Sequence, residues 1–455
     1  MAEEVATFCK HKYYKDGIES DIYRNSPILP QVEKLKVDGR EFRWAATYAA
    51  SPTASPDYLI SQAMATKQGQ NVEFIATKAR HFATLTISQK EIKASRTGKG
   101  AYGRILGNKV FQALEGMRKQ MAKFLYGKGY GELGTYTGST VAAAANAVIT
   151  LPESSTIAMF PGTQFRLMVG GNPATIQPPV GSNPYVVGTV DDTQITLDAS
   201  TSTVGSFNSG DVLIVDGAVD ASGTFHCPHG LGYWILNRND PQYGTLLTDM
   251  TMGVNRSRAP SALGGQFYAA ASTEKRFDAI MKLLRKCRRA GGDPNLVIMN
   301  DLDAAKAIAE YETLRTQFLG TDTTTAKTFR GARDATFVLW SSVLDKLVDD
   351  PFCPEGLAYV LTKEDLCVLH MDNIDKVVSE NAGPGEMPGR ADPMADDGAD
   401  YGETGDKLMI DDLISIEDGQ ATSDGAVKLV GFNLFYEYAL WNTASSGVCD
   451  ISAIA

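Results

Sequence analysis

The hydrophobic pattern of the chain changes period most clearly between residues 78 and 127. Phe82, Thr84 and Thr86 alternate with Leu85 and Ile87, and this period of two predicts a strand ribbon. After a charged, glycine-containing stretch, apolar residues recur every three or four positions, on Tyr102, Leu106, Val110, Leu114, Met117, Met121 and Leu125. This period predicts one helix over 100–126, roughly 40 Å long at 1.5 Å per residue. Such a helix is long for a globular protein and indicates an elongated subunit.

Residues 136–225 have a different composition, rich in Thr, Val, Gly, Ser and Pro and with few charges. Short alternating runs such as Phe165-Leu167-Val169 and Ile195-Leu197 are separated by turn clusters such as 208–211. The pattern predicts a small β-barrel or sandwich of about five to seven strands. Because this segment interrupts the helical and mixed patterns on either side, we expect it to be an inserted domain.

The chain mixes helical and strand patterns from residue 226 onward. A basic amphipathic helix is expected around Phe277, Ile280 and Leu284, capped by Ser272 or Thr273 and closed by two glycines. A second helix is expected from Asp301. Strands are predicted at Leu296–Met299, Leu357–Leu361, Leu366–His370 and 426–441.

Two segments lack sustained periodicity. Residues 1–60 carry short apolar patches, including Trp44, which favour an arm that docks along neighbouring molecules over a free tail. Residues 380–420 are rich in Gly, Asp and Glu and predict a solvated acidic loop.

Composition narrows the function classes. The net charge is −11, which argues against a protein that binds nucleic acid on its own. Basic residues concentrate in 78–128 and 275–289. The six cysteines are scattered without a paired spacing, which predicts reduced thiols. No apolar run approaches 18 residues, so no membrane span and no membrane partner are expected.

Candidate chemistry is sparse. His226-Cys227-Pro228-His229 contains potential zinc ligands, but a structural site needs four ligands and no second cluster is present, so a turn is the favoured interpretation. The acidic group at 392–400 does not follow the calcium-loop order and is interpreted as a solvated loop, with a cation site as the weaker alternative. No nucleophile, phosphate-loop or metalloprotease motif occurs. We therefore expect no catalytic residues, no metal and no cofactor, and we expect that the protein is not an enzyme.

The order of several motifs carries a resemblance. The segment K-G-A-Y-G-R-I-L-G-N-K-V-F-Q-A-L-E-G-M-R-K-Q-M-A-K-F-L-Y-G-K-G at 99–129 is followed by G-V-N-R-S at 253–257 and by helix, Gly-Gly and L-V-I-M-N around 291–300. An Asp-Pro turn at 350–351 then precedes G-x-x-Y-x-L at 356–361. This order resembles the major capsid proteins of tailed bacteriophages, which have the Hong Kong 97-type fold.

The resemblance implies an α+β fold and a domain plan. The implied parts are an N-terminal arm (1–60), an E-loop (61–97), the spine helix of a P-domain (98–135), an inserted β-domain (136–225), an A-domain (226–345) and a return through both domains (346–455) with an acidic loop at 380–420. It also implies inter-subunit contacts by Lys90, Lys93, Arg96, Lys99 and Trp44.

The implied function is self-assembly into hexamers and pentamers of an icosahedral head, built in the host cytoplasm and found in the virion. Implied partners are further copies of the chain, a portal protein, scaffolding and decoration or minor capsid proteins, and packaged double-stranded DNA. Candidate non-specific DNA contacts on the outer face of the helix are Lys109, Arg118, Lys119 and Lys123, with subunit-edge salt bridges as the alternative.

Three alternatives stay open. Some capsid proteins of this kind form isopeptide links between an E-loop lysine and an asparagine, which Asn373 could supply here; ordinary salt bridges are the favoured interpretation. The chain could instead be an encapsulin-like shell protein. It could also be a β-rich enzyme or binding module built on 136–225, which would need a concave aromatic site.

Overall fold

The computed structural model describes residues 26–37, 41–49, 54–64, 70–88, 101–318, 337–339, 342–344, 346–370, 414–417 and 427–454. Helices and strands are mixed throughout, so the predicted α+β class is confirmed. Among the helices in this part of the chain, none has both the length and the apolar character needed to cross a bilayer. The boundaries of the predicted domains remain a prediction.

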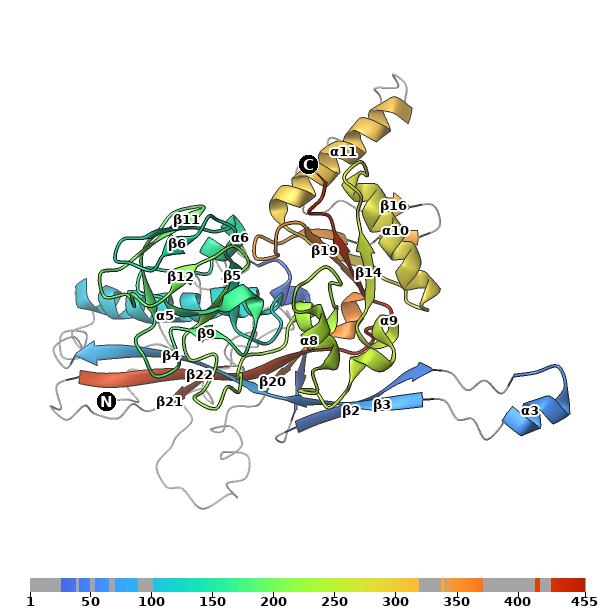
Figure 1. Ribbon diagram of the computed structural model, residues 1–455, viewed down its shortest axis with the longest axis horizontal. Coiled ribbons are helices and arrows are strands. Elements are labelled where there is room, and N and C mark those ends of the chain that lie inside the picture. Colours follow the sequence, from blue (N-terminus) through green and yellow to red (C-terminus); the bar gives the residue numbers. More distant parts are fainter. Residues whose placement is uncertain are drawn as a thin grey trace, which may run out of the picture.

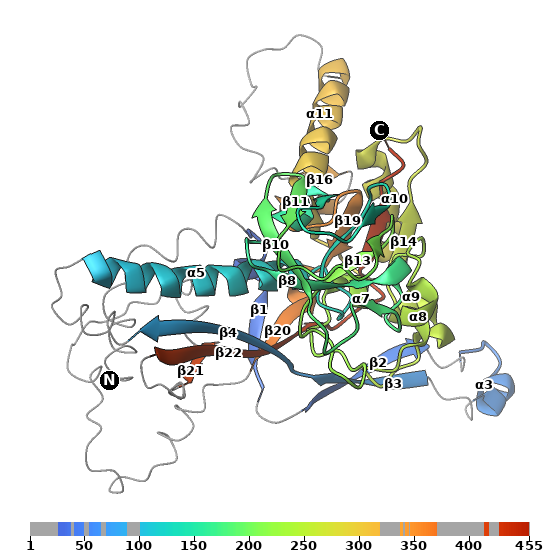
Figure 2. The ribbon, with the colours of Figure 1, turned by 60° about the vertical axis from the view of Figure 1, so that its left-hand side comes forward.

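The predicted long helix is present as α5 (Ala101–Phe124), 24 residues and about 36 Å long. It lies along two long strands, β4 (Ala79–Ser88) and β22 (Val427–Leu440), which pair antiparallel (Figure 2). His81 Nε2 on β4 lies 2.9 Å from Gln120 Oε1 on α5. The sheet is completed by β20 (Leu366–His370), β21 (Ile414–Glu417) and β1 (Glu33–Lys36), which runs parallel to β20.

The ribbon predicted from residue 78 onward is therefore a strand of this central sheet over the range that the structure describes. The hairpin that projects from the body lies earlier in the chain, in β2 (Glu41–Ala49) and β3 (Gln70–Thr77), with α3 (Tyr58–Met64) between them (Figure 1). The structure thus places the projecting arm partly within the range 1–60, for which no regular structure was predicted. The pattern was present, because Phe42, Trp44, Ala46 and Tyr48 alternate with more exposed residues.

The segment after α5 forms the predicted β-rich unit. Seven strands make one sheet and two make a second, with the short helix α6 (Glu153–Thr156) beside them. The larger sheet contains β5 (Glu132–Thr135), β13 (Val212–Val215), β8 (Gln164–Met168), β10 (Tyr185–Val190), β11 (Gln194–Leu197), β7 (Val148–Thr150) and β9 (Ile176–Gln177), and the smaller contains β6 (Val141–Ala142) and β12 (Ser206–Phe207).

A third sheet combines segments from across the chain. Its order is β14 (Gln266–Ala269), β23 (Gly447–Asp450), β19 (Leu357–Leu361), β15 (Leu296–Met299) and β18 (Lys346–Asp349). Helices α10 (Arg276–Arg289) and α11 (Asp301–Phe318) belong to the same part of the molecule (Figure 1). The predicted strands β19 and β20 are both present, but they belong to different sheets. The remaining short elements are α7 (Leu231–Trp234), α8 (Tyr243–Thr248), α9 (Pro260–Leu263) and the pair β16 (Phe337–Leu339) and β17 (Ser342–Leu344).

The predicted cap of α10 is wrong. The helix begins at Arg276, its N-cap residue is Lys275, and no side chain of that residue caps it. The backbone N–H of Arg276 instead donates to Glu310 Oε2 of α11, at 2.8 Å. A tertiary contact therefore replaces the local cap that Ser272 or Thr273 would have supplied.

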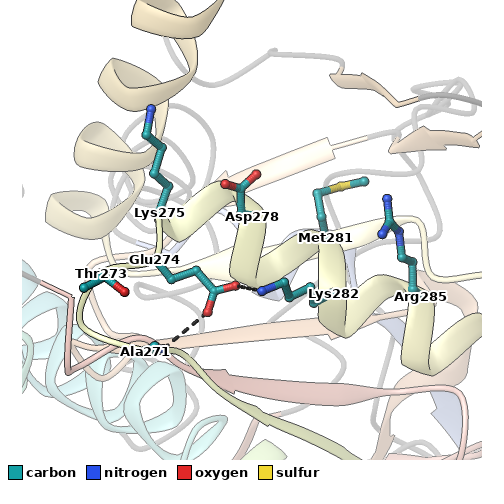
Figure 3. Close-up of a pocket in the computed structure, with 8 residues that line it drawn as sticks. All are labelled: Ala271, Thr273, Glu274, Lys275, Asp278, Met281, Lys282 and Arg285. Carbon is teal, nitrogen blue, oxygen red and sulfur yellow. Dashed lines mark hydrogen bonds and ion pairs between the residues drawn. The ribbon is translucent and has the colours of Figure 1, made fainter.

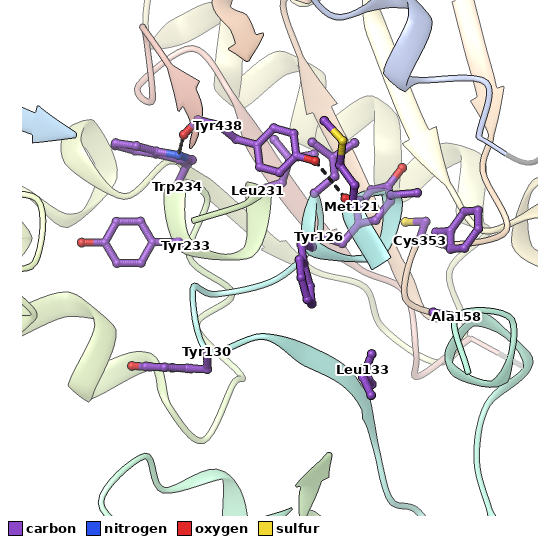
Figure 4. Close-up of a cluster of buried hydrophobic side chains, with 14 of the residues drawn as sticks. Met121, Tyr126, Tyr130, Leu133, Ala158, Leu231, Tyr233, Trp234, Cys353 and Tyr438 are labelled. Atoms are coloured by element: carbon purple, nitrogen blue, oxygen red, sulfur yellow. Dashed lines mark hydrogen bonds between the residues drawn. The ribbon is translucent and has the colours of Figure 1, made fainter. Parts of the chain in front are cut away.

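One continuous core joins α5, the β-rich unit and the central sheet. Met121, Tyr126, Leu133, Trp234 and Tyr438 are all buried within it (Figure 4). The hydroxyl of Tyr438 donates to the Met121 carbonyl at 2.8 Å, so β22 is tied to the last turns of α5.

Candidate functional site

An aromatic cluster holds the base of the projecting hairpin. Successive strand residues point to opposite faces, so Phe42 and Trp44 share one face, and Trp44 pairs in register with Phe74 on β3. The ring centroid of Trp44 lies 5.4 Å from that of Phe74, 5.6 Å from that of Trp234 and 5.3 Å from that of Trp441. These rings come from the hairpin, from α7 and from the segment after β22.

The cluster ties the hairpin to the body of the molecule. Each aromatic pair at such a distance contributes about 0.5–1.5 kcal/mol beyond the burial of its area. Trp234 Nε1 also donates to the Tyr438 carbonyl on β22 at 2.8 Å. The Ile75 N–H donates to the Met252 carbonyl at 2.9 Å, which adds a backbone link. The arm is thus firmly held at its base.

Trp44, predicted to contact a neighbouring subunit, is half-buried against its own chain. The structure therefore gives it an anchoring role within the chain. Its contact with a neighbour stays a prediction.

Helix α3, at the far end of the hairpin, is exposed, whereas the base of the hairpin is packed against the body of the molecule. None of the residues of α3 is buried, and Tyr58, Leu59 and Ile60 are 76%, 71% and 47% exposed. Asp57 Oδ1 accepts the Leu59 N–H at 2.8 Å and so starts the helix. A seven-residue helix is marginal alone in water, since most helical stability comes from packing. Three neighbouring apolar residues that the described chain leaves uncovered make this tip a candidate interaction site.

This exposed tip is not among the predicted contact residues. Asp57 directly before Tyr-Leu-Ile is a helix-start signal that could have found it. Nothing in the local pattern indicates that the three apolar residues are left uncovered, because their exposure depends on where the hairpin points.

Two of the cations predicted on the outer face of α5 are buried instead of exposed. Arg118 and Lys123 are buried, at 8% and 6% exposure, and the Lys123 ammonium donates to the carbonyls of Ser154 and Phe352, at 2.8 and 3.3 Å. Burial lowers the pKa of Lys123 to about 8. Lys119 Nζ lies 3.2 Å from Glu115 Oε1. Both side chains are therefore buried within this chain, whereas the predicted DNA contacts require exposure. Lys123 is covered by α6 and by the segment after β18.

A buried carboxylate lies beside Lys123. Asp350 is fully buried and accepts hydrogen bonds from the Tyr126 hydroxyl at 2.9 Å, the Ser26 hydroxyl at 3.2 Å and the Phe352 N–H at 3.0 Å. Burial raises its pKa to about 6. One carboxyl group thus joins the N-terminal segment, the end of α5 and the turn after β18.

The H-C-P-H cluster does not gather into a ligand set. His226 Nε2 lies 3.2 Å from Asp220, whereas His229 faces the buried Glu437. Burial raises the pKa of the Cys227 thiol to about 12. Within the described residues, no group of three or more His, Cys, Asp or Glu side chains is arranged to hold a metal ion.

The aromatic residues of the β-rich unit do not form a concave binding site. Phe165, Tyr185 and Phe207 are fully buried and pack against one another, with ring centroids 5.0–6.3 Å apart. This arrangement is a hydrophobic core, which disfavours the predicted alternative of a binding module.

Several predicted residues lie outside the described part of the chain. Lys90, Lys93, Arg96 and Lys99, Asn373 and the acidic group at 392–400 all do so. The inter-subunit contacts and the isopeptide link therefore stay predictions.

No protein-family model matches this sequence, and a search of curated proteins finds no match. Several solved structures are similar in overall shape. The capsid asymmetric unit of cyanophage A-1(L) is 13% identical, with 94% of this chain and 93% of that chain covered and a TM-score of 0.46. A structure from Mycobacterium phage Bobi is 9% identical, with 99% and 98% covered and a TM-score of 0.39. The holo-SrpI encapsulin complex from Synechococcus elongatus is 9% identical, with 93% and 85% covered and a TM-score of 0.38.

Proposed function

We propose that this chain is the major capsid protein of a tailed bacteriophage and assembles into a closed shell. The observation that carries the proposal is the β2–α3–β3 arm, which is fixed at its base and presents uncovered Tyr58, Leu59 and Ile60 at its tip. The chain that the structure describes offers these residues no burial. A neighbouring copy would provide it, and the order of sequence motifs at 99–129, 253–257 and 350–361 supports the same function.

Assembly follows from repetition of this contact. Each subunit would donate one arm and receive one, so the contact is heterologous and closes into rings, here hexamers and pentamers. Many such contacts make a stable shell even where each is weak. The basic residues Lys90, Lys93, Arg96 and Lys99 belong to the same proposal as contacts at subunit edges. The wider setting is a head built in the host cytoplasm around double-stranded DNA, with a portal protein and with scaffolding and decoration proteins as partners.

The test compares the wild-type chain with Leu59→Asp by electron microscopy and size-exclusion chromatography. We expect closed shells or rings from the wild type. An aspartate at the tip must be desolvated on contact, so we expect the assembled fraction of the variant to fall at least tenfold. Its circular dichroism should be unchanged, because Leu59 is 71% exposed in the free chain.

The matched control is Val204→Asp, which changes an apolar residue of 52% exposure in the β-rich unit. We expect it to assemble as the wild type does. Wild-type protein that remains near 49 kDa at every concentration, or equal assembly of all three proteins, would contradict the proposal.

A further inference from the structure

Helix α10 presents a strongly positive face in a chain whose total charge is negative. Residues 275–289 contain seven Lys or Arg and one Asp, for a net charge of +6, whereas the whole chain carries −11. Lys275, Lys282, Arg285 and Arg289 follow one another at spacings of seven, three and four residues, which places them in one stripe along the helix. All four are exposed.

Most of these charges have no partner in the part of the chain that the structure describes. Lys282 contacts Glu274 and donates to the Tyr268 hydroxyl at 3.2 Å. No ion pair or hydrogen bond within the described residues involves the side chain of Lys275, Arg285 or Arg289. The helix dipole favours cations at the C-terminal end only, so it does not account for Lys275 at the start of α10.

The stripe borders an open hollow of about 520 Å³. Lys275 and Arg285 point to the same side of α10, with Asp278 and Met281 between them, while Lys282 reaches back to Glu274 (Figure 3). The lining holds Lys275, Lys282 and Arg285 against Glu274 and Asp278, and Glu274 is paired with Lys282. Two cations with Met281 and one opposing carboxylate between them favour an extended peptide that is acidic and partly apolar.

The chain itself contains a segment with this chemistry. Residues 380–412 hold ten Asp or Glu and two Lys or Arg, a net charge of −8. They lie between β20, which ends at His370, and β21, which begins at Ile414. The 43 residues between these ends could span roughly 140 Å when extended, at about 3.3 Å per residue. A tethered segment is also present at an effective concentration of about millimolar.

We propose that the exposed face of α10 binds the acidic segment 380–412 of the same chain, with Lys275, Arg285 and Arg289 as its main contacts. A single surface ion pair contributes about 0–1 kcal/mol, so the interaction rests on several pairs together and on the tether. It weakens as salt shortens the Debye length to about 3 Å at 1 M. The inference does not depend on the proposed shell function.

Carbodiimide coupling of the full chain tests the proposal, because it joins a lysine amine to a carboxylate only where the two are in contact. We expect mass spectrometry to find Lys275 joined to an Asp or Glu of 380–412. Arg285→Lys keeps the charge and should add a second link to the same segment. In 1 M NaCl the yield of both links should fall at least fivefold. The contact of Lys282 with Glu274 is the internal control for coupling.

Two further comparisons decide the outcome. Lys306 is an exposed lysine on the neighbouring helix α11, and the segment should couple to it at least fivefold less. A mixture of ¹⁴N and ¹⁵N chains should give only unmixed links. Mixed links, equal coupling to Lys306, or no link while Lys282 couples to Glu274 would each overturn the proposal. It would also be overturned if a DNA duplex, bound only when Lys275, Arg285 and Arg289 are intact, were the sole ligand found.

Discussion

Asp350 shows how a single residue can make the stability of this chain depend on pH. It accepts hydrogen bonds from Ser26, Tyr126 and the Phe352 N–H in a fully buried position. Its pKa is raised from the ordinary value of 3.8 to about 6, with burial as the largest cause. The raised pKa means that the folded protein favours the protonated carboxyl more than the unfolded chain does. The contribution of Asp350 to stability is therefore complete below pH 3.8 and is lost as the pH rises through about 6.

Asp350→Asn removes this titration and gives the first prediction. Between pH 4 and pH 7, the unfolding free energy of the wild type should fall by about 2 kcal/mol relative to that of the variant, at about 1.36 kcal/mol per pKa unit. Urea denaturation of both proteins at the two pH values measures the difference, in which other titrating groups largely cancel. Parallel pH profiles would show that Asp350 does not titrate in this range.

The burial of Lys123 could not be predicted from the sequence. The helical period places it away from the apolar stripe of α5, which predicts exposure, whereas the structure leaves Lys123 only 6% exposed. Its partners, the carbonyls of Ser154 and Phe352, lie 31 and 229 positions away in the sequence. The helical pattern cannot predict that segments so distant in the sequence bury Lys123.

At the scale of elements, α10 takes its cap from its neighbour α11. Glu310 accepts the Arg276 N–H at 2.8 Å and the Arg276 guanidinium at 2.9 Å. Arg276 is 3% exposed, so Glu310→Ala removes both a helix cap and a charged partner of a buried cation. We expect a loss of about 2–3 kcal/mol in the free energy of unfolding. Glu310→Gln loses the charge, but its single amide oxygen can still accept the Arg276 N–H and so keep the cap, so it should lose less than Glu310→Ala does.

Chemical denaturation of the two variants checks this prediction, with Lys306→Ala as the control. Lys306 is exposed on the same helix, and its replacement should change the free energy by less than about 0.5 kcal/mol. Equal losses for Ala and Gln at position 310 would mean that charge alone matters and that the cap contributes nothing.

The elements themselves could be predicted where a pattern is long or fully apolar. The helix α5 and the strands Leu296–Met299, Leu357–Leu361 and Leu366–His370 are where the sequence predicts them. The pattern does not show which strands pair with one another. The strand Ala79–Ser88 alternates as expected, yet its pairing with Val427–Leu440, more than 300 residues away, determines that it lies in a sheet. The four-residue strand Gly447–Asp450 was missed because it is too short to show a period.

At the scale of the whole molecule, distant segments share sheets and one core. β19 and β20 follow each other closely but lie in separate sheets, so the turn at 362–365 connects the two sheets. The backbone N–H of Trp441 donates to the Asp365 carbonyl at 2.9 Å, which fixes the end of β22 to that turn. The β-rich unit joins the same buried cluster as the hairpin base, since Phe207 and Trp234 both belong to it.

This continuity predicts that the β-rich unit does not unfold as a separate domain. Phe207 is fully buried in that unit, so Phe207→Ala should cost about 3–5 kcal/mol. Three of the four tryptophans of the chain, Trp44, Trp234 and Trp441, lie together at the hairpin base. Tryptophan fluorescence therefore reports mainly on that region. If the core is one cooperative unit, the variant shifts the tryptophan transition and the circular dichroism transition together, to the same lower midpoint. Val204→Ala, at an exposed position of the same unit, should shift neither. A tryptophan transition that stays at the wild-type midpoint while a second, earlier transition appears would instead make 136–225 an independently folding insertion.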